Sequence, residues 1–134
     1  MTASFANPLL ATPSRPLPRA VAVIGAGTIG PDIGYYLKSA LPDLRLYLVD
    51  VSQKAVDSAL LRFQEYSRKA VARGKMSEAD AAAVTSNLFG TLDYADIADC
   101  DWVIEAATEN LTLKRRIFAQ IEAVVSPDAL ITSN

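Results

Sequence analysis

The stretch that decides the fold is AVAVIGAGTIG, residues 20–30. Its first half, Ala20–Ile24, is a short apolar run rich in β-branched residues, which predicts a parallel strand buried on both faces. The second half follows at once and carries Gly25, Gly27 and Gly30 in the spacing G-x-G-x-x-G. Because this spacing lies between a predicted strand and a predicted helix, we expect a loop that holds the pyrophosphate of a dinucleotide at the helix N-terminus.

Each glycine of the loop has its own physical reason. Gly25 permits the tight turn out of the strand, Gly27 leaves room for the pyrophosphate, and Gly30 lets the helix pack closely on the strand. Thr28 and Ile29, between the last two glycines, complete the predicted cofactor loop. The alternative is a tight turn that binds no ligand.

A carboxylate ends the next predicted strand, residues 44–50. Asp50 follows Gly30 by twenty residues, which is the position of the acidic residue that accepts hydrogen bonds from the adenosine ribose. Its charge would repel a 2′-phosphate, so the sequence favours NAD over NADP, although Lys54 is a nearby cation. The alternative is that Asp50 only caps the following helix.

Helices and strands alternate along the chain. The first helix is expected to reach Ala40, with Ile33, Tyr36, Leu37 and Ala40 facing the core. Further helices are predicted from Ser52 to Arg73, from Ser77 to Thr85 and from Leu113 to Val125, and further strands at residues 89–91, 102–105 and 129–132. The order predicts an α/β fold, a Rossmann-type doubly wound parallel sheet with a helical hairpin inserted between strands two and three.

Composition narrows the class of protein. The chain has 134 residues, 51% hydrophobic, which suffices for one compact domain, and a net charge of -2, which argues against nucleic acid as a partner. No stretch is apolar enough for a membrane span, and no secretory signal is recognisable, so a cytoplasmic location is expected.

With one cysteine, Cys100, and no histidine, a metal site is not expected, and Cys100 is interpreted as a buried structural thiol. Residues 1–18 are rich in proline and are expected to form an extended or disordered arm before a single domain, residues 19–134.

The second half of the chain carries a more specific pattern. The block Trp102-Val103-Ile104-Glu105-Ala106-Ala107-Thr108-Glu109-Asn110-Leu111, with Lys114 and the final Ser133-Asn134, resembles the 3-hydroxyacyl-CoA dehydrogenase family. The stretch 48–55 and the predicted helical hairpin resemble it as well. The resemblance covers residues 19–134. It implies an NAD-binding domain of an oxidoreductase that transfers a hydride between NAD and the 3-hydroxyl of a 3-hydroxyacyl-CoA.

The resemblance also implies roles for individual residues. Ala107, Glu109 and Lys114 take the positions of cofactor contacts after the fourth strand. Asn134 takes the position of an asparagine near the nicotinamide and the reacting carbonyl, and Arg73 that of a basic contact to coenzyme A. For Glu109 and Lys114 the alternative is an exposed ion pair, and for Arg73 a solvated surface charge. Glu105 is either structural or turned to the cofactor.

The chain departs from the family in one important respect. The family uses a histidine as general base, and this sequence has none. We therefore expect the catalytic part to lie outside these residues and the chain to be inactive alone. The resemblance also implies a second domain that forms the dimer, and hence a homodimer when full length. Alternatives are the cofactor domain of another hydroxyacid or nucleotide-sugar dehydrogenase, and a non-catalytic NAD-binding module.

Overall fold

The computed structural model describes residues 14–134 and contains one five-stranded sheet. The strands are all parallel and lie in the order β3-β2-β1-β4-β5. Their bounds are β1 (Ala20–Ile24), β2 (Arg45–Val49), β3 (Leu88–Thr91), β4 (Trp102–Glu105) and β5 (Leu130–Ser133). The helices are α1 (Gly30–Ala40), α2 (Gln53–Ala72), α3 (Glu78–Thr85), the 3-10 helix η2 (Tyr94–Ile97) and α4 (Leu111–Val124). The predicted doubly wound sheet is confirmed.

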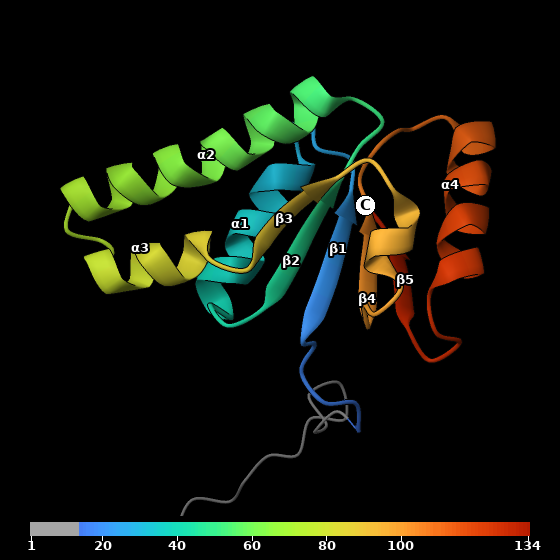
Figure 1. Ribbon diagram of the computed structural model, residues 1–134, viewed down its shortest axis with the longest axis horizontal. Helices are drawn as coiled ribbons and strands as arrows, with labels where there is room; N and C mark the ends of the chain where they lie inside the picture. The colour runs from blue at the N-terminus through green and yellow to red at the C-terminus, as the bar shows by residue number, and fades with distance from the viewer. Residues whose placement is uncertain (1–13) are drawn as a thin grey trace, which may run out of the picture.

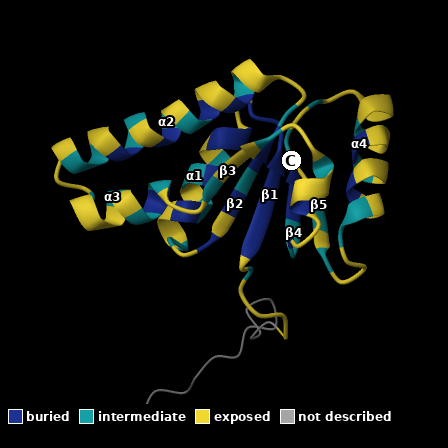
Figure 2. Cartoon of the chain, viewed as in Figure 1, coloured by how far each residue is buried: buried dark blue, intermediate teal, exposed yellow. Residues whose placement is uncertain are grey.

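Helices cover both faces of the sheet (Figure 1). The first core cluster lies under α1 and α2 and includes Leu48 and Phe63, whereas the second lies under α4 and η2 and includes Val103 and Ile121. Strand β1 runs between the two clusters and is buried along its whole length, as Figure 2 shows. A strand buried on both faces explains why its sequence is continuously apolar.

The chain changes direction at β1, and this change positions the site. Strand β1 pairs with β2 on one side and with β4 on the other. The chain moves outward from β1 to β3, crosses back, and then forms β4 and β5 on the opposite side. The loops after β1 and β4 therefore diverge, and open α/β sheets bind ligands in the crevice at such a point.

The predicted helical hairpin lies between β2 and β3. Helix α2 begins after Ser52, whose hydroxyl accepts the Ala55 N–H, and α3 begins after Ser77, whose hydroxyl accepts the Asp80 N–H. Gly74 follows α2 with a φ of +69°, a left-handed conformation in which glycine carries no steric cost. Both helices thus begin next to the serines at which the sequence predicted their starts, and α2 ends just before a glycine.

The core-facing side of α1 differs from the expectation. Tyr36 is 74% exposed and Ala40 is also exposed, whereas Gly34 and Lys38 are buried. The Lys38 ammonium donates to the carbonyl oxygens of Pro42 and Leu44 in the turn after α1. Burial lowers the pKa of Lys38, against a smaller opposing effect of the Asp43 charge. Lys38 was not among the residues predicted to face the core, and carbonyl oxygens satisfy its charge there. Ile33 and Leu37 pack against the first core cluster as predicted.

Helix α4 starts two residues earlier than predicted. Its N-cap is Asn110, whose side chain accepts the Leu113 N–H at 3.0 Å, and asparagine is among the strongest N-cap residues. Ile117 and Ile121 are buried as predicted, and Val124 and Val125 pack at the edge of the same cluster. The expected apolar face of this helix is confirmed.

The predicted arm is covered only in part, because residues 1–13 lie outside the described residues. Residues 14–18 contain no helix or strand, and Arg15 donates to the carbonyl oxygen of Asp128 at 2.6 Å. Cys100 is buried, as predicted, and burial raises the pKa of its thiol to about 12. In the described part of the chain, no helix is both long enough and apolar enough to cross a membrane.

Candidate nucleotide-binding site

The glycine loop connects β1 to α1 by a very close approach of backbone to backbone. Gly25 has a φ of +108°, and a Cβ on it would lie 2.8 Å from the Ala106 carbonyl oxygen. A Cβ on Gly30 would lie only 1.7 Å from the carbonyl oxygen of Gly25. Neither position can hold a side chain in this backbone. Gly25 and Gly30 are thus required by the turn itself, as the sequence predicted.

Gly27 differs from the other two glycines, because a Cβ on it would meet nothing within 4 Å. The residue is exposed and borders an open cleft of about 410 Å³. Its lack of a side chain therefore has no cause within the described residues and leaves backbone accessible from the cleft. This is the arrangement expected where a pyrophosphate approaches the loop.

The cleft brings together most of the residues singled out in the sequence. It lies at the carboxyl ends of β1, β2 and β4. Its lining consists of Gly25, Gly27, Thr28, Ile29, Asp50, Ala106, Ala107, Thr108, Glu109 and Asn134. Three predicted residues do not line the cleft. Gly30 is buried under the loop, Lys114 contacts Glu105 at the end of β4, and Arg73 is exposed at the far end of α2.

Asp50 joins the end of β2 to the glycine loop. One carboxylate oxygen accepts the Ala26 N–H at 2.9 Å and the other accepts the Ser52 N–H at 3.0 Å. The N-cap of α2 is Ser52, whose side chain accepts the Ala55 N–H of the helix. The alternative that Asp50 only caps this helix is therefore not what the structure shows. Each carboxylate oxygen can accept a second hydrogen bond, and Asp50 lines the cleft, so the hydroxyls of a ribose have acceptors there.

Glu105 ends β4 and is fully buried. Its carboxylate forms an ion pair with Lys114 at 2.8 Å and accepts the Ala107 N–H at 2.7 Å and the Ser133 hydroxyl at 3.1 Å. Burial alone would raise the pKa of Glu105, but the hydrogen bonds and the Lys114 charge outweigh it and hold the pKa below its ordinary value. Glu105 is therefore an ionised structural anchor of the cleft wall.

The partner of Lys114 was not anticipated. The alternative considered from the sequence paired it with Glu109, whereas its ammonium contacts Glu105, the Ser133 hydroxyl at 2.9 Å and the Asn134 carbonyl oxygen at 3.3 Å. Only 17% of its side chain is exposed. Lys114 thus ties α4 to the ends of β4 and β5, next to two cleft residues.

Sequence reasoning missed a further cation at the loop. Arg62, on α2, donates to the carbonyl oxygens of Gly27 at 2.6 Å and Thr28 at 3.1 Å, and pairs with Asp32 at 3.1 Å. These contacts join residues 30 to 35 positions apart, so no local pattern reveals them. The opposite charges of Asp32 and Arg62 become neighbours only when α1 and α2 pack together, so the sequence offered no signal for this pair.

A larger cavity, of about 680 Å³, lies at the opposite edge of the sheet. It is bordered by residues 14–18, by residues 98–102, and by residues of the turn before β5. It contains neither the glycine loop nor a helix N-terminus. We therefore place the functional site at the smaller carboxyl-edge cleft, where parallel strands and backbone N–H groups converge.

Comparisons with known proteins agree with this geometry. The family model for the 3-hydroxyacyl-CoA dehydrogenase NAD-binding domain matches residues 20–134. The chain is 36% identical, over 120 residues, to the peroxisomal fatty acid β-oxidation multifunctional protein AIM1 of Arabidopsis thaliana. This match covers 90% of the chain and 16% of the relative.

Two solved structures are similar in both sequence and fold. (S)-3-hydroxybutyryl-CoA dehydrogenase PaaH1 from Ralstonia eutropha has a TM-score of 0.81 and 34% identity, covering 88% of this chain and 41% of that one. 3-Hydroxybutyryl-CoA dehydrogenase from Escherichia coli K12 has a TM-score of 0.83 and 33% identity, covering 88% and 25%. The chain thus spans less than half the length of each of these relatives. The chain belongs to the 3-hydroxyacyl-CoA dehydrogenase family and corresponds to the NAD-binding domain of that family.

Proposed function

We propose that this domain binds NAD in the carboxyl-edge cleft and serves a dehydrogenase that acts on the 3-hydroxyl of a 3-hydroxyacyl-CoA. The observation that carries the proposal is the convergence of the glycine loop and the Asp50 carboxylate on one cleft. Backbone N–H groups at the start of α1 would hold the pyrophosphate, and Asp50 the adenosine ribose. Bound NAD would supply the hydride acceptor.

Two features support NAD over NADP. The Asp50 side chain accepts two backbone N–H groups, which fix it at the proposed ribose position. A 2′-phosphate placed beside this carboxylate would meet a like charge at short range, which is unfavourable without a paired cation. Val51, the next residue, is 92% exposed and offers no charge.

The nicotinamide end of NAD would lie toward the ends of β4 and β5. Ala107, Glu109 and Asn134 line that part of the cleft. Lys114 supports this wall through Glu105 and Ser133, so its proposed contribution to cofactor binding is to position the wall. Since the 134 residues contain no histidine, we propose that the domain binds the cofactor without turning over substrate alone.

The substrate, the location and the assembly belong to the proposal. The relatives are named for fatty acid β-oxidation and for 3-hydroxybutyryl-CoA, which supports an acyl-CoA substrate. Arg73 is exposed at the end of α2 and is free of ion pairs within residues 14–134, so it is available to a phosphate of coenzyme A. We further propose a cytoplasmic protein that forms a homodimer when full length.

Calorimetric titration of the chain with NADH and NADPH tests the cofactor assignment. We expect NADH to bind more tightly than NADPH, and Asp50→Ala to lose about 1–3 kcal/mol of NADH binding free energy, as for a charged hydrogen-bond partner. Asp57→Ala is the matched control, because Asp57 is an exposed carboxylate on α2 outside the cleft. Failure of the folded chain to bind either nucleotide would refute the proposal.

A further inference from the structure

The glycine loop is held from outside the cleft by a side chain of α2. The two Nη atoms of Arg62 donate to consecutive carbonyls, those of Gly27 and Thr28, at 2.6 Å and 3.1 Å. Arg62 is not among the residues that line the cleft. The guanidinium therefore binds the loop from outside the cleft.

The guanidinium is itself fixed in place. Its Nη2 contacts the Asp32 carboxylate at 3.1 Å and the Tyr66 hydroxyl at 3.3 Å, and its Cζ atom lies 5.9 Å from the centre of the Tyr66 ring. The Tyr66 hydroxyl in turn donates to Asp32 at 2.8 Å. An arginine whose N–H groups donate to several partners is a rigid support, because few rotamers of its side chain satisfy all the contacts.

The carbonyls that Arg62 binds determine where two N–H groups point. A trans peptide is planar, and its N–H points opposite to its C=O. The Gly27 carbonyl shares a peptide with the Thr28 N–H, and the Thr28 carbonyl shares one with the Ile29 N–H. With both carbonyls turned to Arg62, both N–H groups are turned to the cleft side. Within residues 14–134, neither donates a hydrogen bond to the protein.

We propose that Arg62 is a positioning residue that aims the Thr28 and Ile29 N–H groups at the pyrophosphate of the dinucleotide. The inference rests on the proposed function, because it assigns those donors to the cofactor. Arg62 also neutralises Asp32, which lies in the first turn of α1. An unpaired carboxylate there would oppose a bound phosphate at the helix N-terminus.

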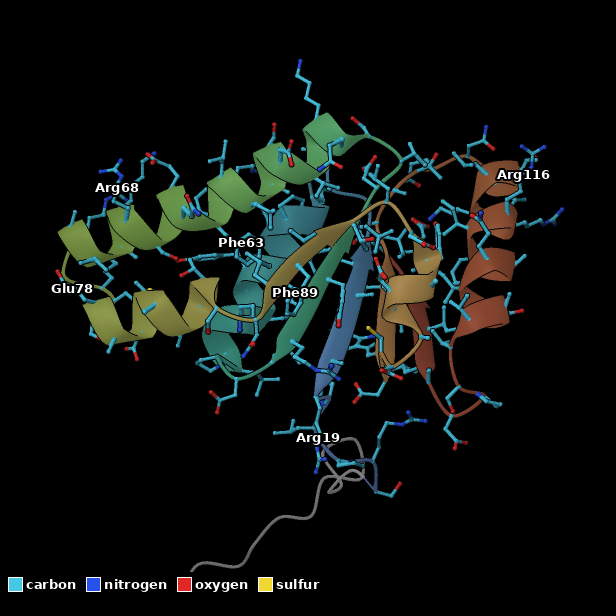
Figure 3. All side chains as sticks on the ribbon, viewed as in Figure 1. Arg19, Phe63, Arg68, Glu78, Phe89 and Arg116 are labelled. Atoms are coloured by element: carbon cyan, nitrogen blue, oxygen red, sulfur yellow. The ribbon has the colours of Figure 1, made fainter. Side chains whose placement is uncertain are left out.

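The proposal predicts a loss that is selective for phosphate-bearing ligands. Arg62→Met keeps an unbranched side chain close in size to the aliphatic part of arginine and removes the guanidinium that binds the loop. We expect it to weaken ADP-ribose binding by about tenfold, while adenosine, which would be held through Asp50, binds as in wild type. Arg68→Met is the matched control, because Arg68 points to solvent from the outer side of α2 (Figure 3) and, within residues 14–134, hydrogen-bonds only to Glu65.

A double variant separates aiming from charge. If Arg62 only masks Asp32, then Asp32→Asn combined with Arg62→Met restores ADP-ribose binding to the wild-type value, and the aiming role is overturned. If Arg62 aims the loop, the double variant remains weak. In NMR spectra without ligand, Arg62→Met is then expected to move the Thr28 and Ile29 amide signals, and Arg68→Met to leave them in place.

Further outcomes are also decisive. Arg62→Lys can donate to the same carbonyls with less geometric constraint, so an intermediate loss is expected, and it serves as the test if Arg62→Met does not fold. An equal loss of adenosine and ADP-ribose would overturn the inference, because a general distortion would then be the cause. Failure of wild type to bind ADP-ribose would instead overturn the proposed function.

Discussion

Asp50 and Glu105 are carboxylates at the ends of β2 and β4, the two strands that flank β1, and their surroundings give them different roles. Asp50 is partly exposed, lines the cleft and retains acceptor capacity after binding two backbone N–H groups. Glu105 is fully buried and is saturated by Lys114, Ser133 and the Ala107 N–H. Only Asp50 can therefore meet a ligand directly, while Glu105 acts on the shape of the cleft.

The ion pair of Glu105 leads to a prediction about acid stability. Because the folded-state pKa of Glu105 is lowered, its ionisation stabilises the fold above its unfolded pKa of about 4.3, and this contribution is lost as the pH falls through the folded pKa. Glu105→Gln should cost about 3 kcal/mol of unfolding free energy at pH 7, as when a buried pair is broken. The gap between variant and wild type should narrow below about pH 4.

Urea unfolding of both proteins at pH 7 and at about pH 3.5 measures this gap. Glu122→Gln is the control, because Glu122 is an exposed carboxylate on α4, and it should follow the wild-type values at both pH values. A Glu105→Gln deficit that stays the same at the two pH values would show that the charge of Glu105 does not provide the stabilisation.

At the scale of elements, local patterns predicted the order of strands and helices. The β1 run, the serine caps of α2 and α3 and the glycine loop are each encoded within a few neighbouring residues. Contacts between distant segments could not be predicted in this way. Arg62 reaches Gly27 across 35 positions, and Lys114 pairs with Glu105 at the end of β4 rather than with Glu109, which is nearer in the sequence.

Helix α1 illustrates the limit of apolar periodicity. Its predicted core face contained Tyr36, but the helix is rotated so that Gly34 faces the sheet. A Cβ on Gly34 would lie 2.8 Å from Leu46 Cδ2, so the glycine lets α1 approach β2 closely. Lys38 then lies toward carbonyls of the following turn. The orientation of α1 on the sheet is therefore decided by how closely its backbone can approach β2 at Gly34, and not by the number of apolar side chains on each face of the helix.

The close approach of α1 predicts a ranking of two glycine variants. Gly34→Ala should lower the free energy of unfolding by about 1–2 kcal/mol, because the clash with buried Leu46 exceeds the gain in helix propensity. Gly30→Ala should cost more and also abolish NADH binding, because its Cβ would overlap the Gly25 backbone, which cannot move independently. Urea unfolding and calorimetry measure both effects. A Gly30→Ala protein as stable as Gly34→Ala would contradict the packing described here.

At the scale of the whole molecule, the sheet separates two edges with different chemistry. The carboxyl edge gathers the glycine loop, Asp50 and the wall supported by Glu105, whereas the amino edge holds the larger cavity beside Cys100 and Trp102. Strand order alone places the ligand at the carboxyl edge, because the chain reverses its direction of winding at β1. Size alone would have selected the amino-edge cavity instead.

The most direct test of the central claim is an NMR titration of the isotope-labelled chain with NADH, following every assigned backbone amide. The account predicts the largest changes at Gly27, Thr28, Ile29, Asp50 and Ala107, with little change around the amino-edge cavity. Changes concentrated at Cys100, Trp102 and Leu130, with the glycine loop unaffected, would place the nucleotide at the wrong edge of the sheet and contradict the account.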